Sequence, residues 1–348
     1  RQKQLEQAKQ DAGVVFRVSG QDQASDFAVD CVPRVLSGEE WSRLQGGTAQ
    51  RARALDAFLQ DIYGEAAIVR DGVLPRSLVA RCPGREAVAS LWPAGMRRAH
   101  VCGFDIVRDD EGRWLVLEDN VRVPSGVAYA MQNRRLIQHA FPELVSSARL
   151  LDPEEAPQLL RKTLEECAPA AVNGGPRIAL LSEGPTDSAY FEHRMLAERM
   201  GIPLAMPGQL ALADDRLYLW DEQGEQQQVD ILYLRMNDVL SQVGRDGELL
   251  GAKLVRAVQA GTLTIANALG NGLADDKAIY SYVPKFIEYY LGEHPLLEQV
   301  TTYHCAEPEQ RRHVLSRLHE LVVKPVDGYG GFGVMIGPHA TREELNEA

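Results

Sequence analysis

Residues 321–334 read Leu-Val-Val-Lys-Pro-Val-Asp-Gly-Tyr-Gly-Gly-Phe-Gly-Val, which puts a lysine late in an apolar strand and four glycines within the next ten residues. Glycine has no Cβ, so its backbone N–H can approach an anionic ligand closely. In a Walker loop the glycines precede the lysine and a helix follows. Here residues 332–336 have the apolar character of a second strand instead. The stretch therefore predicts a glycine-tipped β-hairpin, a flap suited to closing over phosphate groups.

The composition is that of a globular chain with two or three domains. Of its 348 residues, 45% are hydrophobic and 25% are charged, which is enough apolar content for sizeable cores. The net charge of −12 argues against nucleic acid and against an anionic membrane surface as partners. Five widely spaced cysteines form no CxxC pair. We therefore expect neither a disulfide framework nor a zinc site, and a reducing cytoplasm fits best.

A second stretch combines oxygen ligands on what the pattern predicts to be a β-hairpin. Residues 101–108 and 114–120 are apolar runs on either side of Asp-Asp-Glu-Gly. Glu118 and Asn120 are two residues apart, so their side chains share one face of the strand. The turn brings Asp105 almost opposite Glu118. Two carboxylates and an amide oxygen suit Mg²⁺, although a solvated acidic edge strand would have the same pattern.

Residues near this hairpin have both a structural and a functional interpretation. Asp119 should point to the other face of its strand, and we interpret it as structural. Arg122 and Ser125 follow directly and would lie beside any phosphate bound there, or would belong to a tight turn with a salt-bridged arginine. Lys277 follows two aspartates at a predicted helix start. The aspartates would complement the helix dipole, and Lys277 could reach a phosphate.

The middle of the chain has the alternation of an α/β domain. A buried strand at 177–181 leads to a helix at 187–200, with Asp187 or Ser188 as the N-cap. Further strands are expected at 216–220 and 229–234. Strand, helix and strand in this order predict a small Rossmann-like domain. His193 forms no metal-type spacing with another histidine, and we expect it at the surface or a boundary.

Helical spacing of apolar residues predicts further helices outside this domain. They cover residues 38–63, 127–140, 152–168, 247–260 and 274–291, the last of them broken near Pro284.

Taken together, four motifs resemble those of the circularly permuted ATP-grasp family, which includes the glutathionylspermidine synthase-like amide ligases. They are Leu117-Glu-Asp-Asn-Val-Arg-Val-Pro-Ser-Gly126, Ser188-Ala-Tyr-Phe-Glu-His193, Ala274-Asp-Asp-Lys-Ala278 and Val323-Lys-Pro-Val-Asp-Gly328. In most ATP-grasp chains the lysines come first and Glu-x-Asn comes last. Here the order is reversed, which is the permuted arrangement.

The resemblance implies an α/β (α+β) fold: a circularly permuted ATP-grasp fold with an inserted Rossmann-like pre-ATP-grasp domain. Residues 1–150 would carry the Mg²⁺-binding strands, residues 151–265 the Rossmann-like domain, and residues 266–348 the lysines and the glycine-rich loop. An ATP-grasp fold needs more chain after that loop, to complete the lid and hold adenine. We therefore expect the 348 residues to be a truncated or partly ordered form of a longer protein.

The resemblance also implies the activity of an ATP-dependent carboxylate–amine ligase that forms an amide through an acyl phosphate. ATP and Mg²⁺ would be required, and the substrates would be a small-molecule or peptide carboxylate and an amine. One alternative is a non-catalytic ATP-grasp-like scaffold that binds a nucleotide or a partner. Another is a phosphotransferase, which would need a phosphorylatable histidine.

The site residues follow from the same resemblance. Lys277 and Lys324 would bind the ATP phosphates. The lid over them would be formed by Gly328, Gly330 and Gly331. The Mg²⁺ ligands would be Asp105, Glu118 and Asn120. Arg122 and Ser125 would lie next to the transferred phosphoryl group or the acceptor, in a catalytic position.

Overall fold

The computed structural model describes residues 2–16, 25–26, 29–30, 32–143, 150–172, 174–326 and 333–347. The chain divides into two compact units, each built from separate segments. The first unit comprises Arg1–Ser37, Leu91–Met96 and Val123–Ala268, and the second comprises Gly38–Ser90, Arg97–Arg122 and Leu269–Ala348.

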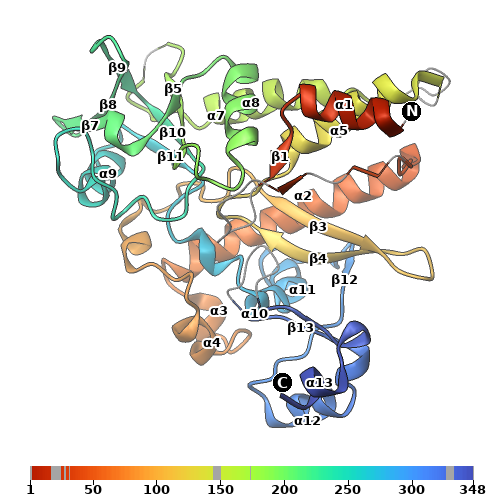
Figure 1. The fold of residues 1–348 in the computed structure, drawn as a ribbon. Helices are drawn as coiled ribbons and strands as arrows, with labels where there is room; N and C mark the ends of the chain where they lie inside the picture. Colours follow the sequence, from red (N-terminus) through yellow and green to blue (C-terminus); the bar gives the residue numbers. More distant parts are fainter. Residues whose placement is uncertain are drawn as a thin grey trace. The chain divides into compact units, whose positions relative to one another are not determined.

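The first unit is organised around a parallel four-stranded sheet with the strand order β11-β10-β5-β6. Its strands are β5 (Ile178–Leu181), β6 (Leu204–Ala205), β10 (Ile231–Leu234) and β11 (Thr264–Ala266). Every residue of β5, β10 and β11 is buried, as expected for parallel strands covered on both faces. Helices α7 (Ala156–Glu165) and α8 (Tyr190–Met200) pack beside these strands (Figure 1). The predicted α/β character of this stretch is confirmed.

Two further groups of elements complete the first unit. An antiparallel sheet consists of β7 (Leu210–Ala213), β8 (Arg216–Trp220) and β9 (Gln226–Val229), and α9 (Leu250–Gln259) packs against β7 and β8. The other group consists of α1 (Gln2–Asp11), β1 (Val15–Phe16), β2 (Ser25–Asp26) and α5 (Val127–Ala140). A small apolar cluster joins α1 to α5 through Leu5, Tyr129 and Leu136.

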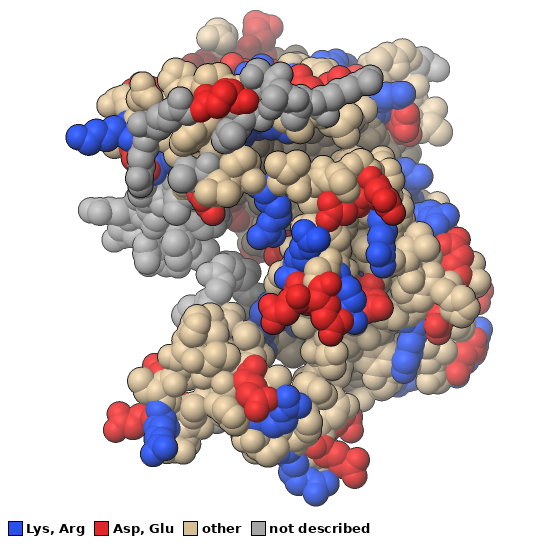
Figure 2. Space-filling model, turned by 90° about the vertical axis from the view of Figure 1, so that its right-hand side faces the viewer, with Lys and Arg blue, Asp and Glu red and all other residues tan. Residues whose placement is uncertain are grey.

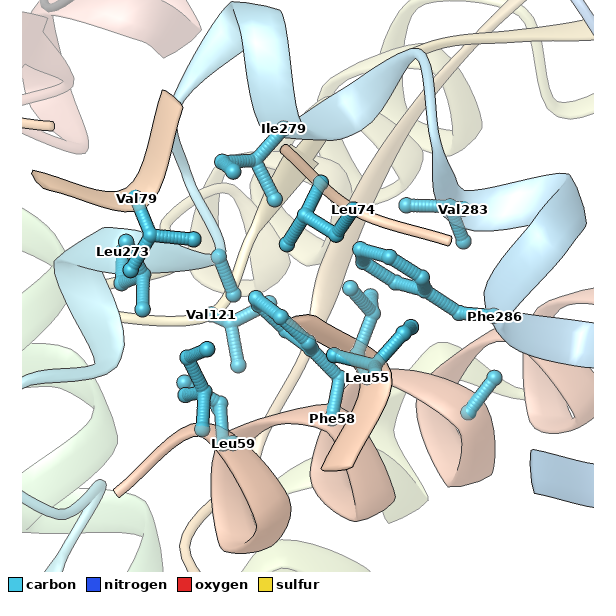
Figure 3. Packing of buried hydrophobic residues seen from close by; sticks show 14 of the residues in the cluster. Leu55, Phe58, Leu59, Leu74, Val79, Val121, Leu273, Ile279, Val283 and Phe286 are labelled. Atoms are coloured by element: carbon cyan, nitrogen blue, oxygen red, sulfur yellow. The ribbon is translucent and has the colours of Figure 1, made fainter. Parts of the chain in front are cut away.

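The second unit is built on a hairpin and one long helix. Strands β3 (Gly103–Arg108) and β4 (Trp114–Asn120) form the hairpin, and β12 (Glu298–Gln299) adds to β4 in parallel. Helix α2 (Gly38–Ile62) supplies Leu55, Phe58 and Leu59 to the main core, where Leu59 lies near Val121 (Figure 3). The rings of Phe58 and Phe286 stack with their centroids 4.3 Å apart.

The remaining elements of the second unit are short. They are α3 (Ala67–Arg70), α4 (Arg76–Arg81), α10 (Lys277–Tyr280), α11 (Val283–Phe286), α12 (Pro308–Ser316), β13 (Val322–Val323), β14 (Met335–Ile336) and α13 (Arg342–Glu347). The break predicted near Pro284 is confirmed, because α10 and α11 are separate and a π-helical turn follows at Ile287–Leu291. Strands β13 and β14 pair antiparallel, as the hairpin prediction requires.

Two predictions about the 187–200 helix are wrong. The helix begins at Tyr190 with Ala189 in the N-cap position, because the carboxylate of Asp187 accepts the N–H of Ala189 at 2.7 Å in the turn before the helix. His193 is buried, with 1% of its surface exposed, and its Nδ1 lies 2.8 Å from the hydroxyl of Ser182.

Charged side chains of both signs lie on the surface of the molecule. On the face drawn in Figure 2, lysines and arginines are interspersed with aspartates and glutamates. Among the described residues, none of the helices combines the length and the apolar character needed to cross a bilayer.

Candidate functional site

The hairpin β3–β4 brings together the three predicted metal ligands. Its register pairs Asp105 with Glu118 and Gly103 with Asn120, which confirms that Asp105 lies opposite Glu118. The amide nitrogen of Asn120 lies 3.4 Å from Oδ1 of Asp105. A register shift between Asp105 and Ile106 marks a β-bulge, a device that re-aims side chains on a strand. The hairpin thus presents two carboxylates and one amide in a small area.

The side chain of Asp119 lies on the opposite face of β4, as expected. Arg51 of α2 holds it with two bonds, Nε to Oδ1 at 2.6 Å and Nη2 to Oδ2 at 2.8 Å. Both side chains are buried. The guanidinium of Arg51 lowers the pKa of Asp119, but burial raises it more, so the net direction is upward. This pair anchors the strand whose other face carries Glu118 and Asn120.

Both predicted phosphate-binding lysines meet the carboxylate of Glu118. The Nζ of Lys277 lies 2.9 Å from Oε1 of Glu118, and the Nζ of Lys324 lies 3.6 Å from Oε2. The three side chains are 17%, 28% and 21% exposed for Lys277, Lys324 and Glu118, respectively. Three residues from distant parts of the sequence therefore form one partly enclosed group with two positive charges around one negative charge.

The position of Lys277 is fixed by the two aspartates before it. Asp276 caps α10, where its carboxylate accepts the N–H groups of Ala278 at 2.8 Å and Ile279 at 3.1 Å. Asp275 accepts the N–H of Val121 at 2.5 Å and that of Arg122 at 3.1 Å. Asp275 thus ties the end of β4 to the start of α10, a role that its position at a helix start did not reveal.

Lys324 directly follows β13, one residue beyond the strand in which it was expected. The N–H of Lys277 donates to the carbonyl of Val326 at 3.2 Å, so the stem of the predicted flap is bonded to α10. The predicted lid glycines, Gly328, Gly330 and Gly331, lie outside the described residues.

The two predicted catalytic residues have different surroundings. Arg122 lies in the second unit, with its Nη2 3.4 Å from Oε1 of Glu86. Ser125 lies in the first unit. Its hydroxyl donates to Oε1 of Glu192 at 2.9 Å and accepts from Nη2 of Arg235 at 2.6 Å. These two bonds make Ser125 part of a hydrogen-bonded network with Glu192 and Arg235.

Glu192 and Arg235 are the parts of this network that the sequence did not reveal. Glu192 also accepts the N–H groups of Gly126 at 2.8 Å and Ala128 at 3.0 Å, at the start of α5. Arg235 bonds the carbonyl of Pro124 and lies 2.9 Å from Oε1 of Glu192. The only available signal was Glu192 within the motif Ser188–His193, and no local spacing connects it to Ser125.

The electrostatics of Asp105 suit a cation. Burial raises its pKa, the neighbouring carboxylate of Glu118 raises it further, and Lys324 and Lys277 oppose the rise. Within the described residues, no three His, Cys, Asp or Glu side chains group as metal ligands. Two carboxylates plus the amide of Asn120 are nevertheless hard oxygen donors, and Mg²⁺ commonly keeps phosphate and water as its other ligands. The donor set therefore fits Mg²⁺ held together with a phosphate.

The chain matches a known class of protein in structure and in sequence. In structure, the chain is similar to a glutathione synthetase-like effector from Globodera pallida, with a TM-score of 0.54 and 14% identity, covering 99% of this chain and 76% of that one. At this identity the likeness concerns the fold alone. In sequence, residues 33–348 match the family described as circularly permuted ATP-grasp type 2.

The chain therefore belongs to the circularly permuted ATP-grasp type 2 family, as the four motifs predicted. It is 48% identical over 346 residues to a protein of Frankia alni provisionally named glutamate–cysteine ligase 2-3, covering 96% of this chain and 39% of the relative. It is 48% identical over 345 residues to the similarly named 2-2 protein of Frankia casuarinae, covering 98% of this chain and 40% of the relative. The chain thus spans about two fifths of the length of these relatives.

Proposed function

We propose that the protein carrying this chain is an ATP-dependent carboxylate–amine ligase. The observation that carries the proposal is the meeting of Glu118 with Lys277 at 2.9 Å and with Lys324 at 3.6 Å. Membership in the ATP-grasp family and the ligase names of the Frankia relatives support it. Lysines bind the phosphates of a nucleotide, and carboxylates bind the metal ion that accompanies it. This one group of side chains contains both.

Each residue of the group has a proposed role. Lys277 and Lys324 bind phosphate oxygens of ATP, and the segment with Gly328, Gly330 and Gly331 covers them. Asp105, Glu118 and Asn120 hold Mg²⁺, which when bound neutralises phosphate charge and orients the terminal phosphoryl group. Arg122, beside the end of β4, stabilises negative charge on the transferred group or on the acceptor. Ser125 orients the turn that follows Arg122, through its bonds to Glu192 and Arg235.

The proposed reaction has two steps. An oxygen of the substrate carboxylate forms a bond to the γ-phosphorus of ATP, the bond from that phosphorus to the bridging oxygen breaks, and ADP leaves. The nitrogen of the second substrate then attacks the acyl carbon, the carbon–oxygen bond breaks, and phosphate leaves while the nitrogen loses a proton. The protein supplies positioning and positive charge, and no covalent nucleophile is needed.

We propose amino acids or peptides as the substrates. The support is the name glutamate–cysteine ligase carried by both Frankia relatives and the resemblance of the motifs to those of glutathionylspermidine synthase-like ligases. In both cases the acid is an amino acid or a peptide, whereas the amine is an amino acid in the first case and a polyamine in the second.

The test is release of ADP and phosphate by the complete protein with Mg²⁺–ATP and pooled amino acids, with each substrate omitted in turn. We expect ADP release that requires both an acid and an amine, together with a product whose mass is that of the two substrates less one water. If the protein binds ATP but releases no ADP with any pool, the non-catalytic scaffold is the correct alternative.

A further inference from the structure

A small cavity in the second unit is lined in part by Glu86, whose side chain contacts Arg122. It has a volume of about 250 Å³ and is lined by Tyr63, Ala80, Cys82, Arg85, Glu86, Ala87 and Ser90. This is below the range of about 300–1,000 Å³ that is typical of pockets for drug-sized ligands. The cavity therefore has the size for a molecule such as an amino acid.

Hydrogen bonds of backbone groups and of the Tyr63 hydroxyl hold the wall of the cavity in place. The N–H of Glu86 lies 3.4 Å from the hydroxyl of Tyr63, which itself donates to the carbonyl of Gly270 at 2.8 Å. Gly84 packs so closely on the backbone of Gly272 that there is no room for a Cβ. Burial raises the pKa of Tyr63 to about 12, so this hydroxyl stays protonated. The loop from Cys82 to Ser90 is therefore preorganised.

The cavity presents opposite charges on adjacent residues. Arg85 is exposed, whereas Glu86 is partly enclosed, with 20% of its side chain exposed. Oε1 of Glu86 lies 3.4 Å from Nη2 of Arg122, a long contact for an ion pair between a carboxylate and a guanidinium. A ligand with one ammonium and one carboxylate group would complement both signs here.

The cavity is also connected to the proposed phosphoryl site by a short path in the chain. Arg122 reaches Glu86 with its side chain, and its N–H bonds Asp275 at 3.1 Å. Asp275 lies two residues before Lys277, and Arg122 lies two residues after Asn120. Glu86 of the cavity wall thus contacts Arg122, which lies two residues after the predicted metal ligand Asn120 in the sequence.

We propose that this cavity binds one substrate of the ligase as an amino-acid zwitterion. Arg85 receives the carboxylate, and Glu86 receives the ammonium group. The inference rests on the proposed ligase function and adds the place where one substrate binds and the residues that select it.

The test is calorimetric titration of the complete protein with each common L-amino acid in the absence of ATP. The amino acid that binds best is then compared with its deamino and decarboxy analogues. We expect each analogue, and each of the variants Arg85→Ala and Glu86→Gln, to weaken binding by about tenfold or more, as for loss of a charge-assisted hydrogen bond. The matched control is Arg81→Ala, because Arg81 is exposed on α4 and does not line the cavity.

Three results would overturn the proposal: no amino acid binds, an analogue binds as tightly as the amino acid, or Arg85→Ala and Arg81→Ala have the same effect. Thermal unfolding of each variant checks that the fold is intact. Nucleotide binding and ADP release, measured separately, distinguish failure of this inference from failure of the ligase function. A ligase that turns over with unaltered substrate affinity in Arg85→Ala would refute only the cavity assignment.

Discussion

Arg51 and Asp119 form a two-bonded ion pair that is buried in the second unit, with Nε of Arg51 2.6 Å from Oδ1 of Asp119. Asp119 lies between Glu118 and Asn120 along β4, so its side chain is on the face opposite to theirs. The pair therefore fixes the rotation of β4 about its own axis, and with it the direction in which the predicted metal ligands point.

Replacement of Arg51 by methionine should strongly destabilise the protein. Asp119 would be left buried without its partner, which typically costs about 3–5 kcal/mol. The measurement is the free energy of unfolding in urea. The control is Arg53→Met, because the pair of Arg53 with Glu293 has side chains 61% and 41% exposed and such pairs contribute about 1 kcal/mol or less. Equal losses in the two variants would contradict the structural role of Arg51.

Glu118→Gln should abolish most of the proposed ligase activity while leaving the fold intact. The variant loses a negative charge that contacts two lysines and that we propose as a metal ligand, and we expect turnover to fall by about a hundredfold or more. The control on the same hairpin is Glu111→Gln, because the side chain of Glu111 is 74% exposed. Turnover of Glu118→Gln at the unmodified rate would refute the metal assignment.

Lys277→Met and Lys324→Met should each weaken ATP binding by about tenfold or more, because each removes a proposed charged donor to phosphate. Both lysines contact Glu118, so the losses in the double variant should not add. Equilibrium binding of a fluorescent ATP analogue measures this. Lys253→Met is the matched control, since Lys253 also bridges two carboxylates, those of Asp246 and Glu248, each at 2.6 Å. Strictly additive losses would show that the lysines act separately.

Asp275 should make the protein less stable as pH rises toward neutrality. Burial raises its pKa from 3.8 to about 7 against the two backbone N–H bonds, so the folded state binds a proton that the unfolded state has released. The stabilisation is present in acid and is lost as pH rises from about 4 through about 7. In Asp275→Asn, this fall in the free energy of unfolding should be smaller.

Urea unfolding at several pH values measures the effect. The control is Asp71→Asn. The hydroxyl of Tyr289 lowers the pKa of Asp71, so the Asp71 contribution is lost only as pH falls below the ordinary range of the carboxyl group. A profile for Asp275→Asn identical to that of the unmodified protein would show that Asp275 is ionised throughout.

The hairpin was predictable because its geometry is local. Alternation along a strand puts Glu118 and Asn120 on one face, and the short turn fixes the residue opposite Glu118. Asp105 is that residue. The family motifs added the expectation that Lys277 and Lys324 act with these ligands. That both lysines contact the same carboxylate depends on tertiary packing, which spacing does not encode.

The network around Ser125 was not predictable for a related reason. Glu192 lies on α8 and Arg235 follows β10, so their bonds to Ser125 depend on how three separate segments pack. Aspartate is a favoured N-cap residue, so the sequence predicts a start of α8 at Asp187 that is too early. Its carboxylate instead bonds within the preceding turn, which is the competition between local turns and helices that aspartate often enters.

The contact of Glu118 with both lysines has a consequence for the salt dependence of ATP binding. A site with two uncompensated lysines would collect anions from solution and release them when ATP arrives, so affinity would fall steeply as salt is added. Here a carboxylate of the protein already acts as the counter-ion of Lys277 and Lys324. When ATP binds, its phosphates would therefore replace a carboxylate of the protein and few ions from solution. The affinity for ATP should then fall less with added salt than two positive charges would suggest.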